Sequence, residues 1–188
     1  IAKYLPLKGV VDAVNITDGA GAKSHISSLI VANSMKVNDI EPIIQLTLRD
    51  RNRIALQSDI LGASSIGVSN FLVLTGDPVE VGDEKDAKFV GDFTDSIELM
   101  KLLVQMRDKS ILNSGKKINL SPHIFLGAAD APFDPPVDWK PKRLEEKILS
   151  GANFFQTQYC FDMEVCKKYF ERLSDLGILE QSSWLVGI

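Results

Sequence analysis

The pattern of apolar and polar positions is clearest at Phe71–Pro78, which reads FLVLTGDP. An unbroken apolar run ends there in Thr75, Gly76, Asp77 and Pro78, and a run bounded by turn residues predicts a strand buried on both faces. Gly76 permits close approach of the backbone, and Pro78 ends the hydrogen-bond ladder. Asp77 is therefore expected at the carboxyl end of a buried strand, where parallel α/β proteins bind ligands, unless the Asp-Pro pair only caps a loop.

The rest of the chain alternates between strand-like and helix-like patterns. The predicted strands are Val11–Thr17, Pro42–Leu48, Phe71–Leu74, His123–Ala128, Phe154–Gln158 and Trp184–Ile188. The predicted helices are Lys23–Met35, Ile54–Ile66, Thr94–Arg107, Lys142–Ser150 and Met163–Leu176. Ile26 and Ile30 have helical spacing in the first helix, and Ile54 is a candidate core residue of the second. The charged segment Val81–Gly91 and the Pro-rich segment Asp130–Pro141 are predicted to be irregular.

Strand and helix alternate without a break, which predicts a parallel sheet with right-handed crossovers. Two architectures meet this description, an open doubly wound sheet and a closed (β/α)8 barrel. Polar residues recur at the strand ends, as one barrel mouth would require, so we expect a single (β/α)8 TIM barrel domain over residues 1–188. Six of the eight strands can be counted, and we expect one further strand upstream of Ile1 and one downstream of Ile188.

The composition is that of an ordinary globular domain. The chain has 188 residues, of which 45% are hydrophobic and 24% charged, and its net charge is -4. A mildly acidic chain gives no electrostatic reason to expect nucleic acid or an anionic membrane as a partner. No apolar stretch approaches the roughly 20 residues that span a bilayer. The two cysteines, Cys160 and Cys166, do not form a disulfide framework, so a reducing, cytoplasmic location is expected.

The motifs of several common enzyme classes are missing from the sequence. No strand is followed by GxGxxG or GxxxxGK(S/T), no GxSxG occurs, and His25 and His123 belong to no HExxH or His/Cys cluster, so no metal site is expected. Gln156 and Gln158 share one face of a predicted strand and suit a ligand with several donors and acceptors. Asp77 could act as a base, accept a hydrogen bond from a heterocycle or stabilise a developing cation. The residues alone thus point to a barrel-type site for a polar organic ligand, with the reaction open.

Five motifs, in chain order, resemble the methylenetetrahydrofolate reductase family. They are TDGAGA, QLTLRDRN, LTGDP, FLGAAD and GANFFQTQYCFD, which follow or contain the first five predicted strands. The resemblance extends from about Val11 to Phe161. It implies a (β/α)8 barrel that holds FAD and passes hydride from NAD(P)H through the flavin to 5,10-methylenetetrahydrofolate. The product implied is 5-methyltetrahydrofolate, in one-carbon metabolism and methionine biosynthesis.

The resemblance also implies roles for individual residues. Asp77 matches the family Asp near the flavin pyrimidine edge, which also faces the folate and would stabilise a cationic substrate. Gln158 matches the Gln that binds the pterin. Lys147, on spacing alone a surface lysine, matches a Lys near the FAD phosphates. The remaining positions matched to cofactor contacts are Thr17, Gln45, Thr75, Gly76, Gly127 and Ala129.

Some positions depart from the family pattern. The family often has His, Tyr and Arg where this chain has Gln45, Asp18 and Thr75, and Lys140 stands where an Asp would serve the FAD ribose. The family general acid is a Glu on the first barrel strand, to which no residue of this sequence corresponds. Three hypotheses stay open: a flavin-dependent reductase, a flavin-free protein that binds a reduced pterin and reduces it or transfers a methyl group, and a non-catalytic barrel subunit. A homo-oligomer or a complex with a partner subunit is also expected.

Overall fold

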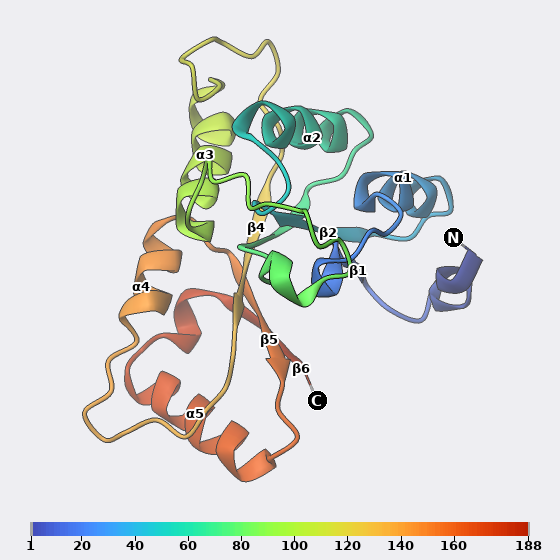
Figure 1. Cartoon of the computed structure of the whole chain (residues 1–188). Coiled ribbons are helices and arrows are strands. Elements are labelled where there is room, and N and C mark those ends of the chain that lie inside the picture. Colours follow the sequence, from blue (N-terminus) through green and yellow to red (C-terminus); the bar gives the residue numbers. More distant parts are fainter. Residues whose placement is uncertain (1, 188) are drawn as a thin grey trace.

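The computed structural model describes residues 2–187 of the chain, and its centre is one parallel sheet (Figure 1). Within this range, six strands pair in the order in which they occur in the sequence, and every neighbouring pair is parallel. The strands are β1 (Val14–Ile16), β2 (Pro42–Thr47), β3 (Asn70–Leu74), β4 (Phe125–Asp130), β5 (Phe154–Tyr159) and β6 (Ser183–Gly187). This sequential order is that of a (β/α) barrel, whereas the strand order of a doubly wound sheet reverses at a switch point.

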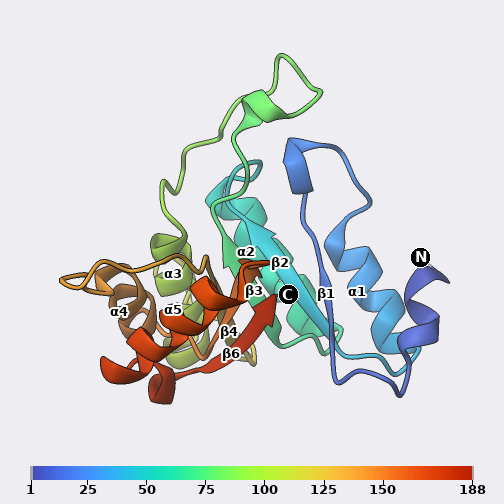
Figure 2. The same cartoon turned by 90° about the horizontal axis from the view of Figure 1, so that it is seen from below.

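Helices cover one face of the sheet, as the alternating pattern predicts. They are α1 (Ser28–Val37), α2 (Arg53–Ser65), α3 (Ser96–Lys109), α4 (Lys142–Leu149) and α5 (Met163–Asp175). Short 3-10 helices in the connections are η1 (Ala2–Leu7), η2 (Ala20–Ala22), η3 (Val79–Val81) and η4 (Leu179–Gln181). Figures 1 and 2 show α1 to α5 outside the sheet and β1 and β6 at its two edges. Within residues 2–187, no helix is both long enough and apolar enough to cross a membrane.

The larger hydrophobic core lies between the helices and the outer face of the sheet. Phe71 and Val73 of β3, Leu126 of β4 and Phe155 of β5 belong to it, and each is at most 1% exposed. The helices contribute Leu56, Ile60, Leu99, Leu103, Tyr169 and Leu173. Because successive strand residues alternate between the two faces, the residues between these outward positions point to the opposite, concave face.

The sheet is rolled into a half-barrel. In a flat sheet, β1 and β5 would lie about 19 Å apart, since neighbouring strands are spaced by about 4.8 Å. Asn15 Nδ2 of β1 nevertheless donates a hydrogen bond to Gln156 Oε1 of β5 at 2.6 Å. Only a strongly curved sheet lets these two side chains meet across its concave face, and Figure 2 shows the sheet from below.

Capping residues explain where several helices begin. Asn52, Asp95 and Asp162 are the N-cap residues of α2, α3 and α5, and each side chain accepts hydrogen bonds from backbone N–H groups of the first turn. Asp95 also accepts two hydrogen bonds from Arg143 of α4, at 2.6 and 2.7 Å. The Arg143 guanidinium, aided by the Ile97 N–H, lowers the pKa of the Asp95 carboxyl against the opposing effect of burial. This carboxylate therefore both caps α3 and joins it to α4.

Most predicted elements are found to within two residues of their predicted limits, but the first strand and helix begin later. β1 begins at Val14 and α1 at Ser28, whereas the pattern predicts Val11 and Lys23. Gly19 and Gly21 take left-handed backbone conformations around η2, with φ of 60° and 65°. Lys23, the first residue of the predicted helix, is extended, with φ of -115° and ψ of 151°. Ile188, the end of the last predicted strand, lies outside the described residues.

Three apolar residues expected to face the core are instead exposed. Ile26, Ile30 and Ile54 are 55%, 54% and 72% exposed. Ile26 precedes α1, and the buried face of that helix includes Ala32 and Met35. Ile30 lies within α1 but on the other side of the helix from Ala32, because successive helical residues are about 100° apart.

The concave face is apolar toward the amino ends of the strands. Ile43, Leu72 and Phe154 pack together there, and Phe125 stacks on Phe154 with ring centroids 5.5 Å apart. Gly127 of β4 pairs in register with Phe154, and the Phe154 ring would overlap any Cβ added at Gly127. The missing side chain of Gly127 is therefore what lets the Phe154 ring fill the interior.

Replacement of Gly127 by Ala should destabilise the chain, because the added methyl group would displace the buried Phe154 ring. Overpacking of this kind lowers the free energy of unfolding by about 1–3 kcal/mol. Urea denaturation followed by circular dichroism measures the change. Gly62→Ala is the matched control, since its Cβ would meet only Leu29 Cδ2 at an ordinary contact distance of 3.4 Å. Equal stability of the two variants would contradict this account of Gly127.

Candidate functional site

A cavity of about 680 Å³ opens at the carboxyl ends of the strands, on the concave face of the half-barrel. Its lining residues come from every strand of the sheet. Leu72, Leu74 and Leu185 contribute apolar surface, and polar side chains contribute most of the remainder. Small-molecule sites occupy roughly 300–1,000 Å³ and combine apolar walls with a few polar groups, so this cavity has the size and the lining of a ligand site.

Three amide side chains form a hydrogen-bonded chain across the concave face. Gln45 Nε2 donates to Asn15 Oδ1 at 2.9 Å, and Asn15 Nδ2 donates to Gln156 Oε1 at 2.6 Å. All three residues are partly exposed and line the cavity. Because an amide carries two donors and a carbonyl with two lone pairs, this chain leaves hydrogen-bonding capacity for a ligand.

Asp77 lies after β3 at the rim of the cavity, where the sequence places it. Its Oδ2 accepts a hydrogen bond from the Gly21 N–H at 2.7 Å, and its backbone carbonyl accepts one from Arg49 Nη1 at 3.1 Å. Asp77 stays exposed. The loop after β1 thus orients the Asp77 carboxylate, which stays accessible to a ligand.

Asp18, the second carboxylate of the cavity, is tied to its neighbours. Its Oδ2 accepts hydrogen bonds from the backbone N–H and the hydroxyl of Thr47, at 2.8 and 2.9 Å, and from Arg51. Arg51 also donates to Asp59 of α2 at 2.9 Å. Burial alone would lower the pKa of Arg51, but the carboxylates of Asp18 and Asp59 raise it, so the guanidinium stays charged. Asp18 therefore anchors the end of β1 to the end of β2.

The charged side chains that line the cavity are both acidic. Among the described residues they are Asp18 and Asp77, and no Lys, Arg or His lines this cavity. Such a wall favours a neutral or cationic heterocycle over an anion, because like charges repel within a partly enclosed site.

Lys147 lies just behind the cavity wall. It is half-buried on α4, and its Nζ donates to the backbone carbonyl of Ala129 at 2.6 Å. Burial lowers the pKa of the Lys147 ammonium, and the nearby carboxylates of Asp130 and Asp95 only partly oppose this effect. An ammonium that is partly withdrawn from water and bound to a neutral carbonyl favours the approach of an anionic group.

The structure brings most of the predicted site residues to this cavity. Those that line it are Thr17, Gln45, Thr75, Gly76, Asp77, Ala129 and Gln158. Gly127 and Lys147 do not line it. The Phe154 ring fills the space where a Gly127 side chain would lie, and the approach of a cofactor to this glycine stays a prediction. Lys140, which departs from the family pattern, is exposed in the loop before α4.

Sequence reasoning missed two residues that shape the site, Asn15 and Arg49. Asn15 links Gln45 to Gln156, and Arg49 holds two loops at the rim. Alternation within VDAVNIT places Asn15 on the same face as Thr17, and this signal could have identified Asn15. No comparable local pattern in the sequence identifies Arg49 as a buried arginine that holds two loops.

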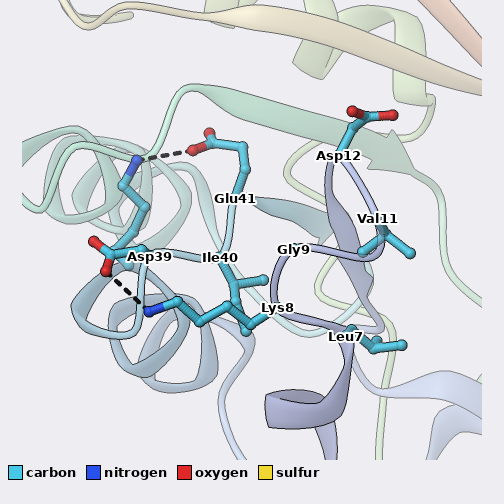
Figure 3. Close-up of a pocket in the computed structure, with 9 residues that line it drawn as sticks. Leu7, Lys8, Gly9, Val11, Asp12, Asp39, Ile40 and Glu41 are labelled. Atoms are coloured by element: carbon cyan, nitrogen blue, oxygen red, sulfur yellow. Dashed lines mark hydrogen bonds and ion pairs between the residues drawn. The ribbon is translucent and has the colours of Figure 1, made fainter.

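A second cavity, of about 380 Å³, lies near the amino ends of β1 and β2 (Figure 3). Lys8 pairs there with Asp39 at 3.0 Å, and Lys36 pairs with Glu41 at 2.9 Å. Because these charges neutralise one another, and because the amino-terminal face of a barrel serves stability, we assign this cavity to the packing of the connections.

The fold and the larger cavity define a class of protein, a parallel (β/α) half-barrel with a ligand site at the carboxyl ends of its strands. A family model described as Methylenetetrahydrofolate reductase matches residues 7–188. The chain therefore belongs to the methylenetetrahydrofolate reductase family, which its sequence motifs predict and this match confirms. Membership in this family supports an oxidoreductase that acts on a folate.

Asn15→Ala should weaken the half-barrel, because it removes the link between Gln45 and Gln156 and leaves both amides without a partner. We expect a loss of about 1–2 kcal/mol in the free energy of unfolding, measured by urea denaturation. Asn113→Ala is the control, since Asn113 is exposed in the loop after α3 and its replacement should change stability by less than about 0.5 kcal/mol. If both variants unfold at the same urea concentration, the amide chain does not hold the sheet in its curved form.

Proposed function

We propose that the chain catalyses reduction of 5,10-methylenetetrahydrofolate to 5-methyltetrahydrofolate with NAD(P)H and bound FAD. The observation that carries the proposal is the cavity in which Asp77 and a chain of amides surround apolar side chains, in a member of this family. When bound, FAD supplies hydride transfer between NAD(P)H and the folate. The residues of the chain hold and orient the reactants.

The cavity residues fit the ring system of a flavin. The lining leucines offer an apolar surface to a flat ring, and Gln45 offers an amide to its polar edge. Thr17 and Thr75 are exposed at the rim and add hydroxyl groups. Gly76, with φ of 93°, supplies the backbone turn between Thr75 and Asp77 at this rim.

Lys147 fits the diphosphate of FAD. Its ammonium is half-buried, its pKa is lowered by burial, and its hydrogen-bond acceptor among the described residues is the carbonyl of Ala129. A phosphate oxygen near Lys147 would give this ammonium a charge-assisted hydrogen bond, which is about twice as strong as one to a neutral acceptor. Ala129, which lines the cavity, would then adjoin the cofactor.

Asp77 and Gln158 would act on the folate. The Asp77 carboxylate would stabilise the cationic iminium form of the methylene substrate, because opposite charges attract strongly in a partly enclosed site. Gln158 is exposed at the rim and can both donate to and accept from the edge of a pterin. No glutamate lines the cavity within residues 2–187, so we assign the proton donor to no residue of this range.

We also propose that the half-barrel belongs to an eight-stranded (β/α)8 barrel that forms one domain. The curvature that brings Asn15 and Gln156 together supports this proposal, since it is the curvature of a barrel wall. Eight parallel strands with a shear of eight close such a wall around a packed interior.

A flavin-free protein that binds a reduced pterin is the second candidate. The acidic cavity wall favours it, because the lining residues offer no cation to a diphosphate within the described chain. Gln45, Asp18 and Thr75 also replace side chains that the family often has at these positions. In this case hydride would pass directly from NAD(P)H to the pterin.

Asp77→Asn should slow folate reduction far more than NAD(P)H oxidation with an artificial electron acceptor. The amide keeps the size of the side chain but removes the charge that stabilises the cationic substrate, an effect of about 10²–10³-fold on kcat. Steady-state kinetics of the two reactions with purified full-length protein measures the difference. Asp86→Asn, in the exposed loop after η3, controls for the loss of one negative charge. Equal losses in both reactions would mean that Asp77 has a structural role.

Lys147→Met should weaken FAD binding by about 10- to 100-fold, because a charge-assisted hydrogen bond to a phosphate contributes about 1.5–3 kcal/mol. Quenching of flavin fluorescence during titration of the apoprotein measures the affinity. Lys142→Met is the matched control, since Lys142 lies on the same helix but is exposed. Unchanged affinity in Lys147→Met would mean that Lys147 does not contact the diphosphate, whereas no FAD binding by the unaltered protein would favour the flavin-free candidate.

A further inference from the structure

Arg49 is buried although it is charged. It follows β2, and its side chain is only 5% exposed. Its Nε and Nη2 donate to the two carboxylate oxygens of Asp50, both at 2.6 Å. The hydrogen bonds to Asp50 raise the pKa of Arg49, so the guanidinium stays charged. Because Asp50 neutralises it at close range, Arg49 adds little positive field to the cavity.

The rest of the guanidinium contacts two backbone carbonyls on different loops. Nη2 donates to Gly19 O at 3.0 Å, in the loop after β1, and Nη1 donates to Asp77 O at 3.1 Å, in the loop after β3. β2 lies between β1 and β3 in the sheet. One side chain at the end of the middle strand therefore fixes the separation of the loops on either side of it.

These two loops meet at the hydrogen bond that orients Asp77. The Gly21 N–H of the first loop donates to Asp77 Oδ2 of the second loop at 2.7 Å. Their short helices η2 and η3 lie side by side in Figures 1 and 2. Arg49 holds Gly19, two residues before the donor, and it also holds the backbone of the acceptor residue. The hydrogen bond from Gly21 to Asp77 thus joins two loops whose separation Arg49 fixes.

Two glycines make room for the Arg49 side chain. A Cβ at Gly19 would lie 2.5 Å from Arg49 Nη2, and a Cβ at Gly76 would lie 3.2 Å from Arg49 Cβ. Both glycines have positive φ, of 60° and 93°. The backbone on both sides of Arg49 is therefore shaped around this side chain.

We propose that Arg49 is a positioning residue that orients the Asp77 carboxylate toward the cavity by joining the loops after β1 and β3. The proposal rests on the role in folate reduction proposed for Asp77. Arginine suits this task because its planar group carries donors in several directions, here to Asp50, Gly19 and Asp77. Lysine has a single nitrogen and cannot reach all three acceptors in this arrangement.

The Gly21 amide reports on this arrangement without any assay of activity. Ala20–Gly21 is the only Ala–Gly step in the sequence. Alanine labelled with carbon-13 at the carbonyl and glycine labelled with nitrogen-15 therefore give one HNCO cross-peak from these 188 residues, that of Gly21. A hydrogen bond to a carboxylate is short and charge-assisted and moves the amide proton downfield. Asp77→Asn gives the reference position of this signal when the carboxylate is lost.

Arg49→Gln should move the Gly21 signal toward the position that it has in Asp77→Asn. It should also lower kcat for folate reduction at least about tenfold, with KM for NAD(P)H unchanged, since small misplacements of a reacting group lower rates strongly. Arg49→Lys keeps the charge but not all of the hydrogen bonds, so its Gly21 signal and its kcat should lie between those of the unaltered protein and those of Arg49→Gln. Arg107→Gln is the matched control, because Arg107 also binds the carboxylate of the next residue, Asp108, but its backbone contact is with Ile124 and not with the loops after β1 and β3.

A Gly21 signal at the wild-type position in Arg49→Gln would overturn the proposal, and Arg49→Lys decides in the same way if the Gln variant does not fold. The double variant Arg49→Gln/Asp77→Asn gives a second test. If Arg49 acts through Asp77, Arg49→Gln lowers kcat no further once Asp77 is altered, so full additivity of the two losses in kcat would also overturn the proposal. A moved Gly21 signal with unimpaired folate reduction by Asp77→Asn would support the positioning by Arg49 and refute the role proposed for Asp77. A moved Gly21 signal with no folate reduction by the unaltered protein would support the positioning and refute the proposed function instead.

Discussion

The hydrogen bonds that Asn15 makes across the concave face are the constraint on which the site depends. Asn15 joins Gln45 on the neighbouring strand to Gln156 on a strand four places away, which is possible only in a curved sheet. Curvature turns the carboxyl ends of separate strands toward one cavity, so residues far apart in sequence can face one ligand. The lower part of the same face is closed by Phe154, which occupies the space above Gly127. The interior is therefore dry and packed at one end and polar and open at the other.

The distribution of charge follows from how each ion is held. Cations close to the cavity are withdrawn from its wall: Arg49 is bound to Asp50, Arg51 is bound to Asp18, and Lys147 lies behind the wall. Of the two carboxylates that line the cavity, Asp18 is bound to Arg51, whereas Asp77 is exposed at the rim. In the proposed reaction, this arrangement would stabilise a neutral ring that becomes cationic, as an iminium does. The half-buried ammonium of Lys147, behind the wall, would be left for an anionic group of the cofactor.

Local patterns in the sequence predict the succession of elements and the position of Asp77, because alternation, caps and turn residues act over a few positions. The (β/α) half-barrel and the family follow from these patterns together with the motifs. Contacts between distant strands are not encoded locally, so Asn15 and Arg49 escape sequence reasoning. The start of α1 is mispredicted because Lys23, the first residue of the predicted helix, has an extended backbone that the helical spacing of the apolar residues does not reveal. Gly127 matches a family position by sequence, but only the structure shows that the Phe154 ring fills the space where its side chain would lie.

The visible absorption spectrum of the purified full-length protein, with any bound cofactor released and identified, shows whether the protein holds FAD and uses it to reduce the folate. We expect flavin bands near one equivalent per chain, which bleach when NAD(P)H is added and recover when 5,10-methylenetetrahydrofolate is added. A colourless protein that cannot be reconstituted with FAD would contradict this expectation. That result would assign the acidic cavity to a reduced pterin alone and would give Lys147 another role.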